Sequence, residues 1–310
     1  MCKKEFLKSI RIIKKAIKRL WVNKEFVFRR SLNLTSMVLS FIGVIGLFVP
    51  ITDLLEHINH FVVKIFIGLC IILVIWFVTF IISCFVFFLK RRFSVIGLQN
   101  HHHVYVQYGD VFSEDEVLDP SKRRNIVIDF NRCFDTKVND DLISSTSLHG
   151  QTVNKILNEK DMDYKVLNSE LQADLCKRQH LIPEQLSIKA KRDGNLKRFP
   201  AGSIAEYKLN EKEVYFCLGL STLNYDLTAN TSSDEYGKAI MSLIEYIQNR
   251  SQGLSVVMPI LGVGLAKTEN DERDTLEFMV KAFKLYRRKL NCDIHIIVWE
   301  GKDPISITDL

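Results

Sequence analysis

The stretch VVMPILGVGLAK, from Val256 to Lys267, ends a β-rich apolar segment in two closely spaced glycines. The residues that follow it, TENDERDTLEFMVKAF, have the apolar spacing of a helix. A strand, a glycine turn and a helix start together often hold a phosphate, because backbone N–H groups approach an anion closely where no Cβ intervenes. Lys267 stands where a dinucleotide-binding fingerprint has its third glycine, and no Gly-Lys-Ser/Thr follows. The turn therefore predicts an anion-binding site without specifying its ligand.

The sequence around this turn predicts alternating strands and helices. The turn Arg192–Asn195, RDGN, is typical of a hairpin, so we expect a mixed sheet. From the strand near 214 onward the order is βαβαβ, which places ligands at the carboxyl ends of the strands. The expected strands are Val104–Tyr108, Asn125–Phe130, Val214–Leu218, Leu254–Pro259 and Ile294–Val298. The expected helices carry the apolar stripes Tyr236, Ile240, Leu243 and Ile247, and Leu276, Met279, Phe283 and Tyr286.

The basic residues are concentrated at one end of the 310-residue chain. The net charge is +6, but residues 1–30 hold eleven of the 42 basic residues and two of the 36 acidic ones. The remaining 280 residues are slightly acidic. A nucleic-acid-binding domain keeps its basic surplus on the folded body, so nucleic acid is not an expected partner.

The seven cysteines predict neither a metal site nor a disulfide framework. They form no Cys-x-x-Cys pair, their number is odd, and Cys70 and Cys84 lie inside an apolar run. Reduced thiols in a cytosolic domain fit this pattern best. No metal ligand and no cofactor are expected.

Two uncharged runs predict membrane spans, at about residues 32–51 and 65–89. Twenty helical residues extend about 30 Å, the thickness of the hydrocarbon layer. Basic residues flank the pair, while the connecting loop 52–64 has one lysine. Both termini are therefore expected in the cytoplasm, in a multi-pass protein of the bacterial inner membrane. Residues 1–30 read as a basic amphipathic arm, which either lies on the anionic leaflet or serves as a positive-inside anchor.

These patterns divide the chain into five segments. The arm covers residues 1–30, and the two spans lie within 31–92. A linker follows at 93–103, then an α/β domain at 104–303 and a tail at 304–310. The spans contain no charged residue that would mark an ion path, which disfavours a transporter.

Three strand ends carry the polar residues that suggest a family. VYVQYGDVF places Asp110 after a strand and a glycine, NIVIDFNRCFDT ends a strand in Asn131, and the third end is the turn at Gly262. This trio resembles the macro domain, the ADP-ribose-binding fold. The resemblance implies a three-layer α/β/α fold with a mixed sheet, here preceded by a two-helix transmembrane hairpin.

Further motifs recur in one branch of that family. This part of the chain is similar to the macro domain of Thoeris ThsA, in its membrane-anchored form. The motifs of that domain recur here in the same order: FDT, SLHGQ, FPAGSIAEY, LSTLNYDLTAN and PILGVGLAK. The resemblance covers roughly residues 104–300. The chain departs from ordinary macro domains after Asn131, because the usual Gly-Gly-Gly loop is absent and Gly150 is the one glycine there.

The resemblance implies a role for each motif. Asp110 with Val111 would receive the adenine, and Asn131 would lie by the distal ribose. The turn would wrap the diphosphate with Leu261, Gly262, Val263, Gly264 and Leu265, with Lys267 as a neighbouring cation. Asp135, His149, Gly150 and Gln151 are further candidates, with His149 near the distal end of the ligand.

The resemblance also implies a biological role. The chain would be the effector of a bacterial antiphage system, binding a histidine–ADP-ribose signal made by a TIR-domain enzyme. The bound form would gate or assemble the spans in a homo-oligomer and disrupt the membrane, ending in abortive infection. No catalytic residue is expected. Two other functions stay open: a membrane-tethered ADP-ribosyl hydrolase, and a structural membrane protein with a degenerate macro fold.

Overall fold

The computed structural model describes residues 14–46, 61–178, 181–263, 271–299, 304–308 and 310. It divides into a helical unit and an α/β unit. The α/β unit runs from Arg92 to Gly301. The helical unit takes the residues up to Arg91 and also Lys302–Asp309, so most of the predicted tail belongs with the N-terminal helices.

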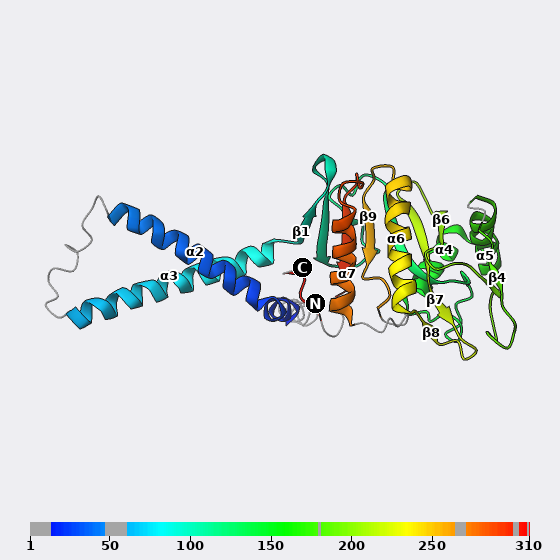
Figure 1. Cartoon of the computed structure of the whole chain (residues 1–310), viewed down its shortest axis with the longest axis horizontal. Coiled ribbons are helices and arrows are strands. Elements are labelled where there is room, and N and C mark those ends of the chain that lie inside the picture. The colour runs from blue at the N-terminus through cyan, green and yellow to red at the C-terminus, as the bar shows by residue number, and fades with distance from the viewer. Residues whose placement is uncertain (1–13, 47–60, 179–180, 264–270, 300–303, 309) are drawn as a thin grey trace, which may run out of the picture. The chain divides into compact units, whose positions relative to one another are not determined.

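A mixed sheet forms the centre of the α/β unit, with eight strands among the described residues (Figure 1). Five run parallel in the order β2-β10-β9-β3-β7, while β1 and β6 pair antiparallel at the two edges and β8 pairs with β7. All five predicted strands are confirmed. The strands are β1 (Arg92–Gly97), β2 (His103–Tyr108), β3 (Arg124–Asn131), β6 (Ile204–Lys208), β7 (Glu213–Leu223), β8 (Ala229–Asn230), β9 (Val256–Pro259) and β10 (Ile294–Val298).

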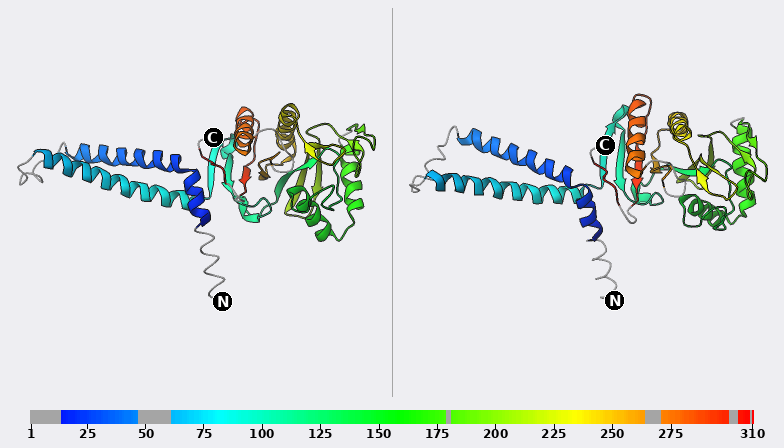
Figure 2. Two further views of the ribbon diagram at one scale, coloured as in Figure 1. Left: turned by 90° about the horizontal axis from the view of Figure 1, so that it is seen from below. Right: turned by 60° about the horizontal axis from the view of Figure 1, so that its bottom comes forward.

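Helices cover both faces of this sheet (Figure 2). The ribbons of α6 and α7 lie on one face and that of α4 on the other. The strands between them are apolar on both sides, as in Ile126–Ile128, because neither face meets water. The helices are α4 (Leu148–Lys160), α5 (Tyr164–Ala173), α6 (Ser233–Arg250) and α7 (Glu272–Leu285), with short turns η2 (Gln99–His101), η3 (Glu114–Glu116) and η4 (Asp174–Arg178).

The long helices start at polar caps and bury the predicted stripes. Ser147 caps α4, Ser232 caps α6 and Asp271 caps α7, each by accepting a backbone N–H of the first turn. The stripe of α6 is buried throughout, as are Leu276, Met279 and Phe283 of α7. Tyr286, the last member of the second stripe, lies just past the end of α7.

The mixed sheet is confirmed, but the linker before it was wrong and the RDGN turn is not its cause. Residues 93–103, expected as a linker, contain β1, because Phe93 and Ile96 are both buried, on either side of a register shift, and the strand pairs with β2. The RDGN turn does not make the main sheet mixed. It lies between β4 (Glu184–Gln185) and β5 (Lys197–Arg198), which form a separate two-stranded sheet.

The helical unit is built on α2 (Lys24–Gly46) and α3 (Phe61–Leu89), which pack against each other. The Thr35 and Thr79 hydroxyls hydrogen-bond at 2.7 Å between the helices, and Thr79 also reaches the Ser31 carbonyl. Hydrogen bonds between side chains such as these help two helices to associate.

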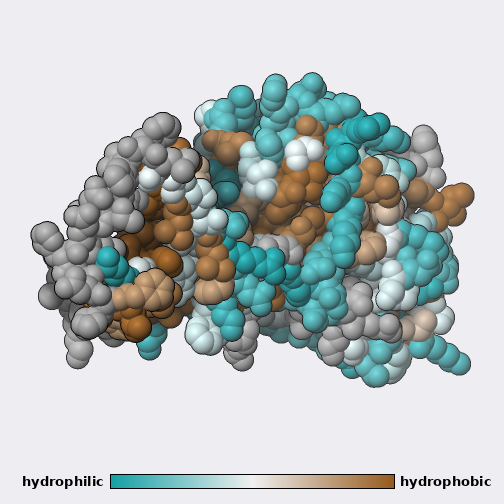
Figure 3. Space-filling model, turned by 60° about the vertical axis from the view of Figure 1, so that its left-hand side comes forward, coloured by the Kyte–Doolittle hydropathy of each residue, from teal (hydrophilic) through white to brown (hydrophobic). Residues whose placement is uncertain are grey.

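In the described part of the chain one helix, α3, is long and apolar enough to cross a membrane. It contains the predicted span 65–89 and exposes large apolar side chains, of the kind drawn brown in Figure 3. The predicted span 32–51 is not confirmed. Its first part lies in α2, and residues 47–51 lie outside the described residues. The same is true of residues 1–13 of the predicted arm.

The end of the chain packs against its beginning within the helical unit. The side-chain oxygen of Asn23, which is buried, accepts hydrogen bonds from the Ser306 hydroxyl, the Ile307 N–H and the Thr308 hydroxyl. The distances are 3.0, 3.1 and 3.0 Å. The tail is therefore a structural part of this unit.

Candidate functional site

The parallel strands bring the predicted ligand residues to one edge of the sheet. Asp110 follows β2, Asn131 ends β3, and Leu261–Val263 follow β9. Since β2, β9 and β3 all run in the same direction as β10, their carboxyl ends meet at that edge. Gly264, Leu265 and Lys267 lie outside the described residues.

The loop after β2 holds Asp110 at the surface and Val111 in the core. The Asp110 side chain is exposed, and its Oδ1 accepts the N–H of Phe112 at 3.0 Å. The Asp110 N–H donates to the buried carboxylate of Glu116. Gly109 must lack a side chain, because a Cβ there would overlap that carboxylate. The loop thus presents the Asp110 carboxylate outward from a closely packed base.

Asn131 organises the turn that follows β3. Its buried side-chain oxygen accepts the N–H groups of Cys133 and Asp135, at 3.1 and 3.4 Å. Phe134 between them has φ +51°, a left-handed conformation that is costly for an aromatic residue. The Asn131 side chain also interacts with the Asp135 carboxylate, which lowers the pKa of that carboxyl against the raising effect of burial. The turn is therefore held by both ends of the Asn131 amide.

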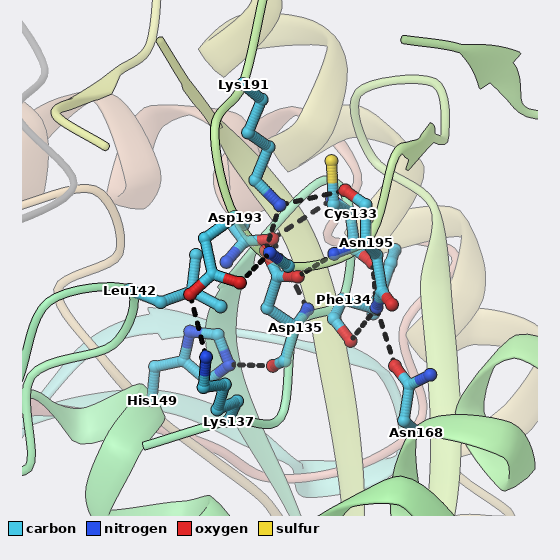
Figure 4. A network of polar contacts seen from close by, with 12 residues as sticks. Cys133, Phe134, Asp135, Lys137, Leu142, His149, Asn168, Lys191, Asp193 and Asn195 are labelled. Carbon is cyan, nitrogen blue, oxygen red and sulfur yellow. Dashed lines mark hydrogen bonds and ion pairs between the residues drawn. The ribbon is translucent and has the colours of Figure 1, made fainter. Parts of the chain in front are cut away.

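Both oxygens of the Asp135 carboxylate accept hydrogen bonds from other residues of the protein (Figure 4). Lys191 donates to one oxygen at 2.6 Å and the Asn195 N–H donates to the other at 2.6 Å. Both charged side chains are almost fully buried. A buried carboxylate requires such pairing. The expected contact between Asp135 and the ligand is therefore not what this geometry provides, because both oxygens already accept protein donors.

Asn195 extends this network to the backbone of the same turn. Its amide nitrogen donates to the carbonyls of Cys133 and Phe134 and to the side-chain oxygen of Asn168 (Figure 4). Neither Lys191 nor Asn195 was predicted to belong to the site. The local signal was the RDGN turn, which follows Lys191 directly and ends in Asn195.

His149 is neutral and fixed by the same turn. Its Nε2 lies 2.9 Å from the Asp135 carbonyl, which can only accept, so Nε2 carries the hydrogen. Its ring lies against Phe130, with the centroids 3.8 Å apart. Burial lowers the pKa of His149 to about 4, and the bond to the carbonyl opposes this only in part. At neutral pH the ring therefore carries no charge and is a weak base.

The start of α4 depends on Gly150. A Cβ on Gly150 would overlap the Ser144 carbonyl, so the loop before α4 can only pass this close to a glycine. The Gly150 N–H donates to the cap residue Ser147. Gln151 is exposed and donates its side-chain amide to the Thr146 carbonyl at 2.8 Å. The helix start is thereby held beside the Asn131 turn.

An acidic residue that the sequence analysis did not select lies beside the glycine turn. Gly262 has φ +80°, which favours glycine, and Leu261 is fully buried. Asp129 of β3 interacts with the Gly262 backbone. Burial raises the pKa of Asp129 to about 6, although its own backbone N–H and that of Gly262 lower it. A carboxylate this close to an expected anion site is unfavourable unless it is protonated or held by backbone donors.

A hollow of about 460 Å³ opens at the carboxyl end of β7, the strand next to β3. Half of its lining residues have short polar side chains, three are apolar and one is an arginine. It is lined by Ala190, Arg198, Thr222, Leu223, Asn224, Thr228, Ala229 and Asn230. Within the described ranges no cluster of three or more His, Cys, Asp or Glu side chains could hold a metal ion.

Residues 104–299 match the family described as Thoeris protein ThsA, Macro domain. The chain belongs to this family. It is 22% identical over 277 residues to the Thoeris protein ThsA of Bacillus amyloliquefaciens (strain Y2), covering 87% of this chain and 84% of that protein. Membership supports a role in antiphage defence and the binding of an ADP-ribose-type ligand.

Solved macrodomains are similar at a lower level. The macrodomain of Mycobacterium tuberculosis DarG is 14% identical with a TM-score of 0.36, over 62% of this chain and 96% of that one. A macrodomain mutant of Oceanobacillus iheyensis is 10% identical with a TM-score of 0.38, over 68% and 88%. Likeness at this level decides nothing by itself. The family match and the mixed sheet between two helical layers establish the macro-domain-like fold.

Proposed function

We propose that the α/β unit binds an ADP-ribose derivative along the edge where β2, β3 and β9 end. The observation that carries this proposal is that Asp110, Asn131 and the Gly262 turn come from three separate strands and meet at one edge. An exposed carboxylate, a side-chain amide and a glycine turn are groups that suit an adenine amino group, a ribose hydroxyl and a diphosphate.

The roles follow from this order along the edge. Asp110 accepts the adenine amino group and the Val111 backbone lies beside it. Asn131 donates to the distal ribose, with His149, Gly150 and Gln151 beyond it. The segment from Leu261 to Leu265 encloses the diphosphate, and Lys267 adds a cation. Asp135 acts through the turn that it braces rather than by touching the ligand.

The site is proposed to bind without turnover. A hydrolase needs a base that activates water near neutral pH. His149, with a pKa of about 4, is a weak base, and its Nε2–H is held by a carbonyl. The Asp135 carboxylate is occupied by Lys191 and Asn195. Neither group is in a state that suits general-base catalysis.

Binding is proposed to act on the bacterial inner membrane. The ligand, histidine–ADP-ribose, is made by a TIR-domain partner during phage infection. Its binding gates or assembles the helices of several copies, because two helices per chain cannot line an aqueous pore. The membrane is then disrupted and infection aborts. The apolar helix α3 supports the membrane part of this proposal.

Isothermal titration of the full chain with ADP-ribose tests the binding step. Asp110→Ala removes the charged acceptor of the proposed hydrogen bond from the adenine amino group. Binding should weaken about 10- to 150-fold, corresponding to about 1.5–3 kcal/mol. The matched control is Asp115→Ala, which removes the same charge from an exposed position in the same loop. Equal affinity of Asp110→Ala and the wild type would refute the assigned adenine contact.

Two further measurements separate the alternatives. Incubation with an ADP-ribosylated protein, followed by mass spectrometry, should show no release of ADP-ribose, whereas steady release would identify a hydrolase. Proteoliposomes loaded with a fluorescent dye should leak only when the signal is added. Leakage of equal extent without any ligand would contradict ligand-controlled disruption.

A further inference from the structure

The loop between β2 and β3 is held by a half-buried arginine and a buried arginine as well as by its own turns. Arg92, the first residue of β1, donates from Nη2 to the carbonyls of Asp115 and Val117, at 2.6 and 2.7 Å. Arg124, the first residue of β3, donates to the carbonyls of Phe112 and Ser113. Four carbonyls of one short loop thus accept from two arginines. A loop held in this way is preorganised for a ligand.

Glu116 connects these anchors to the residue proposed to bind adenine. It lies between the two carbonyls that Arg92 holds, and its side chain is buried. Its carboxylate accepts the N–H of Asp110 at 3.3 Å and the side-chain amide of Gln107 at 2.5 Å. The backbone of Gly109 lies close to the same carboxylate, so Glu116 contacts the two residues that lead into the Asp110 loop. Glu116 is therefore a positioning residue for Asp110.

Arg92 occupies a special place in the chain. It is separated from Leu89, the last residue of the apolar helix α3, by two residues. In the sheet it pairs with Gln107, the residue that donates to Glu116. Arg92, Gln107 and Glu116 thus form one connected group. Toward the N-terminus, the chain passes from Arg92 through two residues into α3.

We propose that Arg92 and Glu116 couple occupancy of the Asp110 loop to the chain segment that enters the membrane helix. This inference rests on the proposed function. Adenine bound at Asp110 fixes Glu116, Glu116 fixes the two flanking carbonyls, and these carbonyls hold the Arg92 guanidinium at the start of β1. The two hydrogens of one terminal nitrogen, Nη2, serve the two carbonyls, and the planar guanidinium fixes their directions. A lysine side chain is one bond shorter and ends in a flexible ammonium, so it cannot reproduce this geometry.

Hydrogen exchange of the full chain in nanodiscs of phosphatidylethanolamine and phosphatidylglycerol tests the coupling, with ADP-ribose as the probe. In the wild type, ADP-ribose should slow exchange several-fold in the peptide covering 109–117 and also in the peptide covering 88–97. In Arg92→Lys it should slow exchange in 109–117 only, at saturating ligand. The affinity should fall about 10-fold, the worth of one hydrogen bond to a charged group.

The matched control is Arg91→Lys, the same substitution one residue earlier, which should behave as the wild type. Glu116→Gln, which keeps the shape of the side chain, should also uncouple the two peptides and serves if Arg92→Lys does not fold. Equal protection of 88–97 in the wild type and both variants would overturn the coupling, as would protection of 109–117 alone in the wild type. If ADP-ribose protects neither peptide of the wild type, the proposed function itself fails and the coupling fails with it.

Discussion

The buried ion pair between Lys191 and Asp135 gives the sharpest test of how the ligand site is held in shape. Substitution of Lys191 by Met removes the charge and keeps most of the side-chain length. The Asp135 carboxylate would then keep the Asn195 N–H at 2.6 Å but lose its one buried cation. Removing one partner of a buried pair costs about 3–5 kcal/mol, because the other charge stays desolvated without compensation.

This cost predicts a measurable change in thermal stability. For a domain of about 200 residues, 1 kcal/mol corresponds to about 2–4 °C in Tm, so Lys191→Met should lower Tm by about 6–20 °C. Scanning calorimetry of the full chain in detergent measures this shift. The control is Lys137→Met, whose ion pair with Asp193 is 40% and 36% exposed and should contribute less than about 1 kcal/mol.

A double-mutant cycle with Asp135→Asn completes the test. In the double variant no charge remains buried, so its loss of stability should be clearly smaller than the sum of the two single losses. ADP-ribose affinity should fall in each single variant, because the turn after Asn131 loses its brace. A Tm for Lys191→Met within the range of the Lys137→Met control would show that this pair does not stabilise the site.

Three other predictions address separate features. Burial raises the pKa of Asp129 to about 6, so the wild type should lose folding free energy as pH rises from about 4 to about 6, by at most about 3 kcal/mol. In urea unfolding between about pH 4 and 6, Asp129→Asn should show no such loss of folding free energy. Parallel curves of free energy against pH for the wild type and Asp129→Asn would contradict this. Gly150→Ala should cost about 1–3 kcal/mol in the same assay because its Cβ meets a backbone carbonyl, whereas Gly97→Ala has open space and should be nearly neutral. Thr79→Val should weaken α2–α3 packing by about 1 kcal/mol in detergent thermal unfolding, and the Thr35→Val, Thr79→Val pair should not be additive if their hydrogen bond matters.

Much of the α/β fold was predictable because its signals are local. Each central strand is a short apolar run, since both of its faces are covered. Each long helix has apolar residues at helical spacing, which form one face that packs into the core. The candidate residues at the strand ends were predictable for the same reason. Once Tyr108, Asn131 and Pro259 are recognised as ends of parallel strands, their neighbours must meet at one edge.

The interactions that hold the site in shape depend on distant parts of the chain. Lys191 and Asp135 are 56 positions apart, and Asp135 was expected to bind the ligand rather than to pair with a lysine. Glu116 stands in the acidic run Glu114–Glu116, which gives no sign that its last member is buried. Strand β1 was missed because it lies at an edge and follows a basic run. None of these features has a periodicity that a local pattern could reveal.

The hydrogen bonds of Asn23 to residues 306–308 have a consequence for how the α/β unit is tethered. Because the chain returns to the helical unit after Gly301, two chain segments connect the α/β unit to it, one before Arg92 and one after Gly301. A single proteolytic cut in one of these segments would therefore leave the α/β unit joined to the helical unit through the other. A bulky fusion placed after Leu310 would crowd the contacts of residues 306–308 with Asn23.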